Sequence, residues 1–123
     1  MNEFPKFMKH PANKIASSDQ ATPAVEGYVF DGADGSQMAL WTCDETAASG
    51  THVHEFDEYV LVVQGCYTLL IDGKRIPLNA GEEYYIPRGT PHAGEVLAGT
   101  RTIHVFGGHR VDRESAHQIE SVG

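Results

Sequence analysis

The stretch Gly50-Thr-His-Val-His-Glu-Phe-Asp-Glu58 is the part of this sequence that most directly predicts its fold. His52 and His54 are separated by one residue, so on a β-strand both side chains leave the same face, where two imidazoles can share a metal ion. Glu58 has the same parity, but an unbroken strand would place it ~13 Å from His54, and metal bonds are only about 2 Å long. For all three to bind together, the chain must bend through residues 55–57.

A second polar cluster lies in Gly81-Glu-Glu-Tyr-Tyr-Ile-Pro-Arg-Gly-Thr-Pro-His92. Between the two clusters runs Tyr59-Val-Leu-Val-Val63, an apolar stretch with enough β-branched residues to be a buried strand. In the second cluster, Pro87 and Pro91 flank a glycine and favour a rigid turn that brings His92 to the start of another strand. His92 is therefore the natural fourth ligand.

These clusters resemble the two sequence motifs of the cupin family. The first family motif is G-x5-H-x-H-x3-E-x6-G, which His52, His54, Glu58 and Gly65 match at every position except the leading glycine. Gly50 lies two residues before the first histidine instead of six. This motif supplies three of the four metal ligands that the resemblance implies.

The second family motif, G-x5-P-x-G-x2-H-x3-N, is matched from Gly81 to His92, with Val96 where the family often has Asn. Fifteen residues separate Gly65 from Gly81, a short spacing like that of small microbial cupins. The match covers about the middle third of the chain and keeps all four ligand positions. The ligands that the resemblance implies for one divalent transition metal are His52, His54, Glu58 and His92.

The rest of the chain predicts eight or nine short strands and no central helix. Parallel sheets need crossover helices, so these strands must be antiparallel, and closing them into a two-sheet barrel hides their edges. This all-β arrangement is the jelly-roll barrel, or double-stranded β-helix, that the cupin resemblance implies. The expected strands are 27–30, 37–43, 59–63, 67–71, 74–78, 82–86, 93–97 and 101–106.

The chain of 123 residues is long enough for one domain with a real core. We expect an N-terminal arm over residues 1–24, a barrel over 25–108, and a tail over 109–123 with a weak helix over 113–120 or no order. Phe4, Phe7 and Met8 in the arm need a surface that covers them, which is either their own barrel or a neighbour's. We therefore expect a homodimer with strand or arm contacts between subunits.

The amino-acid composition excludes some classes of binding partner. The net charge of -8, from 17 acidic and 9 basic residues, argues against nucleic acid and against anionic membranes. No apolar stretch approaches the roughly 18 residues of a membrane span, and the first residues lack a secretory pattern, so we expect a cytoplasmic protein. Cys43 and Cys66 are too few for a disulfide framework and are expected to be packed thiols.

Three imidazoles and one carboxylate leave one or two positions of a five- or six-coordinate ion open, which is typical of a catalytic or binding site. These donors suit Fe, Mn, Ni, Cu or Zn, and affinity alone does not distinguish them. Our first hypothesis is a metal-dependent enzyme acting on a small organic molecule, by oxygenase-type chemistry or by Lewis-acid isomerase, lyase or decarboxylase chemistry.

Two other classes of function stay open, because cupins support many reactions. One is a non-catalytic, metal-containing module that binds a small ligand. The other resembles the sugar-nucleotide epimerases of this fold, where a histidine paired with an acid and a tyrosine act without a metal. The retained ligand set speaks against this last class.

Trp41 and His104 are candidates for lining a pocket. On the last expected strand, His104 alternates with Ile103 and Val105. If the aliphatic face packs into the core, His104 points outward, whereas a polar substrate cavity would reverse that orientation. The sequence leaves both alternatives open.

Glu55, Asp57 and backbone carbonyls are candidates for accepting the second ring N–H of the ligand histidines. The two acidic residues are better explained as solvated groups at the mouth of the barrel, which is where acidic side chains mostly occur. His10, His109 and His117 lie in the expected arm and tail and are predicted to be surface residues.

Overall fold

The computed structural model describes residues 2–17 and 25–114. These residues form nine β-strands preceded by two short 3-10 helices, η1 (Lys6–Lys9) and η2 (Pro11–Asn13), and the described part contains no long helix. In particular, none of its helices is both long and apolar enough to cross a membrane. The strands are β1 (Val25–Asp31), β2 (Gln37–Cys43), β3 (Ala47–Ala48), β4 (Glu58–Gln64), β5 (Cys66–Ile71), β6 (Lys74–Asn79), β7 (Glu83–Ile86), β8 (Ala93–Val96) and β9 (Thr100–Phe106).

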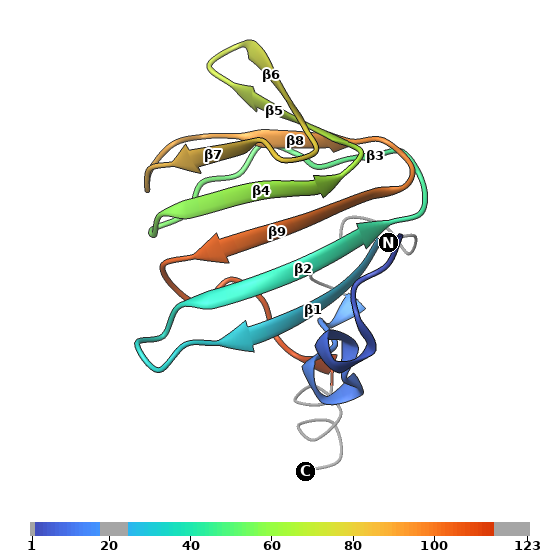
Figure 1. The fold of residues 1–123 in the computed structure, drawn as a ribbon. Helices are drawn as coiled ribbons and strands as arrows, with labels where there is room; N and C mark the ends of the chain where they lie inside the picture. Colours follow the sequence, from blue (N-terminus) through green and yellow to red (C-terminus); the bar gives the residue numbers. More distant parts are fainter. Residues whose placement is uncertain (1, 18–24, 115–123) are drawn as a thin grey trace.

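The strands form two antiparallel sheets that face each other (Figure 1). One sheet has five strands in the order β1-β2-β9-β4-β7, and the other has four in the order β3-β8-β5-β6. The predicted all-β jelly-roll architecture is confirmed. The short strand β3 was expected to be loop, and it forms because Ala47 and Ala48 pair with Val96 and Glu95 at the end of β8.

Two glycine-containing turns set the path of the chain between the strands. Asp72 and Gly73, which join β5 to β6, both have positive φ (52° and 74°), as a two-residue hairpin loop with the right twist requires. Gly65 carries the chain from β4 to β5, and therefore from one sheet to the other, with φ of 83°. A Cβ at this position would lie 2.4 Å from the Thr100 hydroxyl oxygen, so the close approach of β9 requires glycine here.

The interior is divided into three apolar clusters instead of one continuous core. The first cluster extends past the expected limits of the barrel, because Ile15 from the arm and Val111 from the tail are both almost fully buried in it. Phe4 is buried too, whereas Phe7 is 80% exposed, so the arm packs on its own barrel only in part. The domain limits at residues 25 and 108 stay a prediction, but the packing continues on both sides of them.

The C-terminal segment is held to the arm and to β1. Arg113 forms a salt bridge with Asp31, and its guanidinium also donates to the backbone carbonyl of Val29 at 3.0 Å. The helix expected over residues 113–120 lies almost entirely outside the described residues, as does His117. His10 and His109 are exposed, in agreement with the prediction for both.

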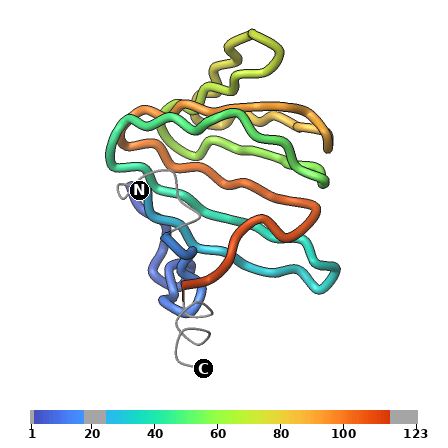
Figure 2. Tube along the Cα trace, turned by 180° about the vertical axis from the view of Figure 1, so that it is seen from behind, coloured from blue at the N-terminus to red at the C-terminus, as the bar shows by residue number. Residues whose placement is uncertain are grey.

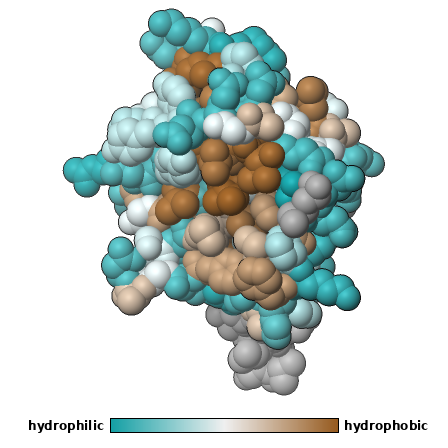
Figure 3. Space-filling model, in the orientation of Figure 1, coloured by the Kyte–Doolittle hydropathy of each residue, from teal (hydrophilic) through white to brown (hydrophobic). Residues whose placement is uncertain are grey.

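The outer face of the five-stranded sheet is unusually apolar. Leu61 on β4, Ile103 on β9 and Leu40 on β2 are direct neighbours in register, and Val105 follows on the same face. Figure 3 shows the hydrophobic patch in the middle of this face. Leu40 is buried, whereas the other three side chains are only half-buried.

Candidate metal centre

The predicted bend is present, and it brings the first ligand cluster to the second. The chain bends at Glu55 and Phe56, and β4 begins at Glu58. His52 and His54 do not lie on a regular strand as expected. Instead, His52 forms a single bridge with His92, in which each backbone N–H donates to the other's carbonyl at 2.9 and 3.0 Å.

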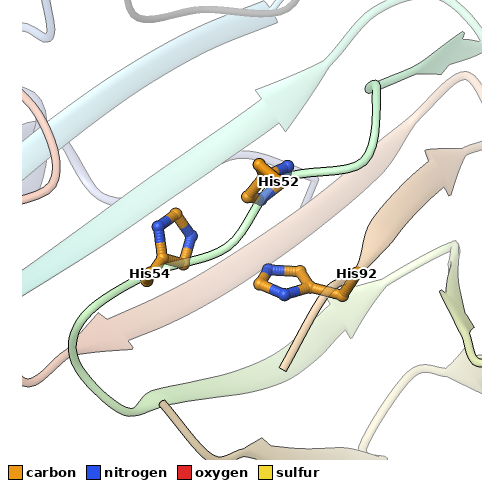
Figure 4. A group of neighbouring side chains, drawn as sticks. All are labelled: His52, His54 and His92. Atoms are coloured by element: carbon orange, nitrogen blue, oxygen red, sulfur yellow. The ribbon is translucent and has the colours of Figure 1, made fainter. Parts of the chain in front are cut away.

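The three imidazoles converge on one point (Figure 4). One ring nitrogen from each of His52, His54 and His92 lies within 4.8 Å of the others. The ring centroids are 4.3 Å apart for His52 and His92, 4.8 Å for His52 and His54, and 5.1 Å for His54 and His92. Two separate segments of sequence thus supply one cluster of nitrogen donors.

Glu58 completes the cluster from the first residue of β4. Its Oε1 lies 3.3 Å from Nε2 of His54 and 3.3 Å from Nε2 of His92. Its other oxygen, Oε2, accepts a hydrogen bond of 2.8 Å from Nδ1 of His104. Only 4% of Glu58 is exposed, so this carboxylate depends on its neighbours for all its polar contacts.

Backbone carbonyls fix the orientation of two rings. Nδ1 of His52 donates to the carbonyl of Gly50, and Nδ1 of His92 donates to the carbonyl of Thr90, both at 2.9 Å. Each imidazole then presents Nε2 with a free lone pair, which is the form that binds a metal. Of the candidates from sequence, the backbone carbonyls perform this role.

The acidic candidates for orienting the rings, Glu55 and Asp57, have other surroundings. Asp57 Oδ1 accepts from the backbone N–H of Arg88 at 2.9 Å and so stabilises the turn before His92. Glu55 is exposed. Among the described residues, neither carboxylate accepts a hydrogen bond from a ligand histidine, and exposed Glu55 fits the alternative of a solvated group.

Electrostatics favour neutral rings at His52 and His54 beside an ionised carboxylate. At His92 burial lowers the pKa, but Glu58 and the Thr90 carbonyl outweigh it and raise the pKa overall. Burial is the main cause that lowers the pKa of His54 to about 4, and burial also lowers the pKa of His52. Burial alone would raise the pKa of Glu58, but the hydrogen bond from His104 and the nearby His92 ring outweigh it and hold that pKa well below its usual range. At neutral pH the imidazoles of His52 and His54 are therefore electron-pair donors, and the carboxylate is an anion.

Three buried polar atoms of the cluster lack hydrogen-bond partners within the described part of the chain, which shows whether these residues fit a metal ion. These atoms are Nε2 of His54, Oε1 of Glu58 and Nε2 of His92. Buried polar atoms without partners are rare in folded proteins. Nitrogen and carboxylate donors aimed at one point match the preferences of a divalent transition metal, so the residues present fit such an ion.

A cavity of about 130 Å³ opens beside the cluster, in the barrel interior. Figure 2 shows the segment between β2 and β4, which carries His52 and His54, crossing the side of the molecule opposite to the view of Figure 1. Trp41 and His104, the two candidates from sequence, both line the cavity. His104 is 5% exposed and points inward, so of the two alternatives for β9 the structure has the polar interior.

Other lining residues were not singled out from the sequence as cavity or site residues, among them Cys43, Ser49 and Arg110. Arg110 lies after β9, just beyond a bend at Gly107 and Gly108. A side chain beyond the last strand carries no motif, and only the fold shows that it reaches the interior. Burial raises the pKa of Cys43 to about 11, so its thiol stays protonated and neutral.

The two facing antiparallel sheets, with three histidines and a carboxylate gathered inside, define the class of small β-barrel proteins built around a candidate metal centre. The chain belongs to the cupin family, because a model of the cupin domain matches residues 39–106. The matched region contains both ligand clusters, β9 and Trp41.

Several solved structures share this fold at low sequence identity. KdgF from Halomonas sp. is 20% identical, with a TM-score of 0.66 over 78% of this chain and 93% of its own. An RmlC-like cupin from Shewanella frigidimarina is 19% identical, with a TM-score of 0.69 over 89% and 96%. The polyketide cyclase RemF from Streptomyces resistomycificus is 19% identical, with a TM-score of 0.67 over 93% and 85%. No curated protein matches the sequence.

Proposed function

We propose that this chain is a metal-dependent enzyme that acts on a small organic molecule. The proposed ligands of one divalent transition metal are His52, His54, Glu58 and His92. The observation that carries the proposal is the convergence of three buried donor atoms without partners, beside a cavity. Leaving each such atom unsatisfied costs about 1–3 kcal/mol, and a cation bound among them removes that cost.

The chain's own residues prepare the site in two ways. Backbone carbonyls hold His52 and His92 in one tautomer, and His104 holds Glu58 so that one carboxylate oxygen stays free. Trp41 packs edge-on against the His104 ring at a centroid distance of 5.1 Å and restricts its movement. A site with preset donors loses little free energy to reorganisation when a ligand arrives.

A divalent transition ion, when bound, supplies Lewis acidity toward a substrate oxygen, and a redox-active one also supplies oxygen chemistry. The cavity beside the cluster provides room for the molecule that reacts. One structurally similar protein is a polyketide cyclase, so this barrel is compatible with catalysis on an organic compound. The two candidate reaction types are therefore oxygenase chemistry and Lewis-acid isomerase, lyase or decarboxylase chemistry.

The test is a matrix of metals, substrates and oxygen. Protein stripped with chelator is reloaded with Fe(II), Mn, Ni, Cu or Zn, and a panel of small carbonyl, enol and catechol-like acids is incubated with each form. Turnover that requires Fe(II) and stops under anaerobic conditions supports the oxygenase. Turnover with several metals and without oxygen supports Lewis-acid chemistry, and metal loading without any turnover would contradict the enzyme proposal.

Matched histidine variants control this experiment. His92→Ala removes a buried donor and is expected to abolish both metal uptake and turnover. His10→Ala removes an exposed imidazole far from the cluster in sequence and should change neither. Equal activity in the two variants would place the reaction elsewhere.

A second candidate, proton transfer without a metal, is favoured by one specific arrangement. His104 donates from Nδ1 to Glu58, which leaves its Nε2 as a base, and the Tyr67 ring lies 5.3 Å from the His104 ring. Burial keeps the pKa of Tyr67 well above its usual range, so its hydroxyl stays protonated as an acid requires. Turnover that survives complete removal of metal but is lost in Tyr67→Phe would favour this candidate.

A further inference from the structure

Arg110 is a cation at the cavity without an acidic partner among the described residues. Arg75 forms a salt bridge with Glu95, and Arg113 forms one with Asp31. The guanidinium of Arg110 has no such carboxylate, yet it lines the same cavity as the histidine cluster. Arg110 is half-buried, so its charge is partly shielded from water and gains from an anion that pairs with it in the cavity.

The backbone around Arg110 is fixed by a buried side chain of β2. Gln37, only 2% exposed, accepts from the backbone N–H of Arg110 at 2.7 Å and of Val111 at 3.0 Å, and it donates back to the Val111 carbonyl at 3.0 Å. Val111 is itself buried in the first apolar cluster. The guanidinium is therefore attached to an anchored segment and not to a loose tail.

Much of the remaining cavity wall is apolar. The third apolar cluster of the barrel forms this wall, so cavity and core share the same side chains. The residues concerned are Val25, Trp41, Cys43, Ala47, Tyr67 and Val96. Hydrogen-bonding groups are few on this side, and a sugar-like ligand with many hydroxyls would leave most of its polar groups unpaired.

The size of the cavity limits the ligand further. Its volume of about 130 Å³ is close to that of the engineered protein cavities that hold a single benzene ring. The close packing of β8 against Tyr67 maintains this space. A Cβ on Gly94 would lie 2.2 Å from the Tyr67 hydroxyl oxygen, so only glycine there lets the ring take its position.

We propose that the cavity binds a small monocarboxylic acid with a compact apolar body of about one ring, whose carboxylate pairs with Arg110 while its body lies against Trp41 and Tyr67. This inference rests on the proposed function, because it names the substrate class of that same site. The chain carries a net charge of -8, so a small anion needs a local cation to enter. A planar guanidinium suits a carboxylate because it donates two parallel hydrogen bonds.

Trp41 makes this binding measurable in the natural protein. It is the only tryptophan of the chain and lines the cavity, so its fluorescence reports on occupancy. Benzoate and its uncharged analogue benzamide are titrated into wild-type protein, with metal removed and with metal loaded. The same titrations are made with Arg110→Gln and with Arg88→Gln, which removes an exposed guanidinium of the same charge.

Metal-free wild type should bind benzoate about tenfold or more tightly than benzamide, as expected for a charge-assisted hydrogen-bonded pair. Arg110→Gln should abolish this preference, because it removes the guanidinium that pairs with the carboxylate. The variant should still fold, since the hydrogen bonds of Gln37 with Arg110 and Val111 reach only their backbone. Arg88→Gln should retain the preference. A benzoate preference that persists in Arg110→Gln, or a metal-free protein that binds neither compound, would overturn the inference.

Failure of this inference and failure of the proposed function are distinguishable. A preference for benzoate that appears only with metal and survives Arg110→Gln places the carboxylate on the ion. That result overturns the Arg110 site and supports the metal site. Arg110-dependent binding in a protein that takes up no metal supports the anion site and contradicts the metal-dependent enzyme.

Discussion

The two faces of β9 differ in burial, and the face with polar side chains is the more buried one. The inner face carries Thr102, His104 and Phe106, all at most 5% exposed, whereas Ile103 and Val105 on the outer face are half-buried. Burying a histidine costs free energy unless its ring has a partner. The hydrogen bond of His104 to Glu58 provides that partner, so the polar face can lie inside.

The inner face of β9 therefore serves the candidate metal centre, and most of the apolar core of the barrel is built from side chains of other elements. The buried apolar side chains gather in three separate clusters. Meanwhile the aliphatic outer face forms a patch on the surface (Figure 3). Substitutions on the two faces should therefore affect different properties, namely metal and ligand binding inside and association outside.

The largest effect is expected from removing the buried carboxylate. Glu58→Ala should lower metal affinity by at least about 100-fold, because it removes a proposed ligand and leaves His104 without its acceptor. Titration calorimetry of the chelator-stripped protein measures this loss. Glu55→Ala, an exposed acidic residue of the same bend, is the control and should bind metal as wild type does. Equal affinities in the two variants would contradict the ligand assignment.

A pair of neighbours on β9 tests the inside-outside difference directly. His104→Ala should lower metal affinity by about 10- to 100-fold, since it frees the carboxylate that it orients. It should also destabilise the fold by about 1–3 kcal/mol, because a buried oxygen of Glu58 loses its donor. Ile103→Ala on the outer face should leave metal affinity unchanged. Denaturant titration measures the free energy of unfolding of both variants, and calorimetry measures their metal affinity. A lower metal affinity in Ile103→Ala would contradict the difference between the two faces.

A smaller effect is expected at the cavity wall. Gly94→Ala forces the Tyr67 ring to move and should cost about 1–3 kcal/mol of unfolding free energy, as overpacking usually does. Gly50→Ala adds the same methyl group where no atom lies within 4 Å and should change stability by less than about 0.5 kcal/mol. Chemical denaturation measures both. Equal losses would show that the ring is not confined as described.

The smallest effect on the site should come from the outer face. We propose that the expected homodimer forms through the patch of Leu61, Ile103 and Val105, because these adjacent half-buried side chains offer a continuous apolar surface. Ile103→Lys should then convert a dimer to a monomer in light scattering while metal affinity stays the same. A monomeric wild type at micromolar concentration would contradict this prediction.

The motifs predicted much of the fold and of the site, because they encode steric and chemical requirements. The bend before Glu58 followed from metal bond lengths, and Gly65 has its place because β9 approaches too closely for a side chain. The Asp-Gly dipeptide by itself favours the two-residue hairpin turn that Asp72 and Gly73 form. Such local requirements are visible in a single sequence.

Other features depend on packing between distant segments and were not predictable. The alternation of His104 with Ile103 is the same whichever side chain points inward. Only the hydrogen bond of His104 to Glu58 on β4 decides between the two orientations. Arg110 reaches the cavity because Gln37, 73 residues earlier, holds its backbone. Ala47 and Ala48 form a strand only because β8 offers an edge to pair with.

Metal analysis of the purified protein tests the central claim most directly. Protein expressed with supplemented Fe, Mn, Ni, Cu and Zn, and purified without chelators, should contain about one divalent transition ion per chain, as a single centre of four protein ligands requires. Anomalous diffraction should place that ion among His52, His54, Glu58 and His92. Near-zero occupancy after such growth, or an ion held by other residues, would contradict the account.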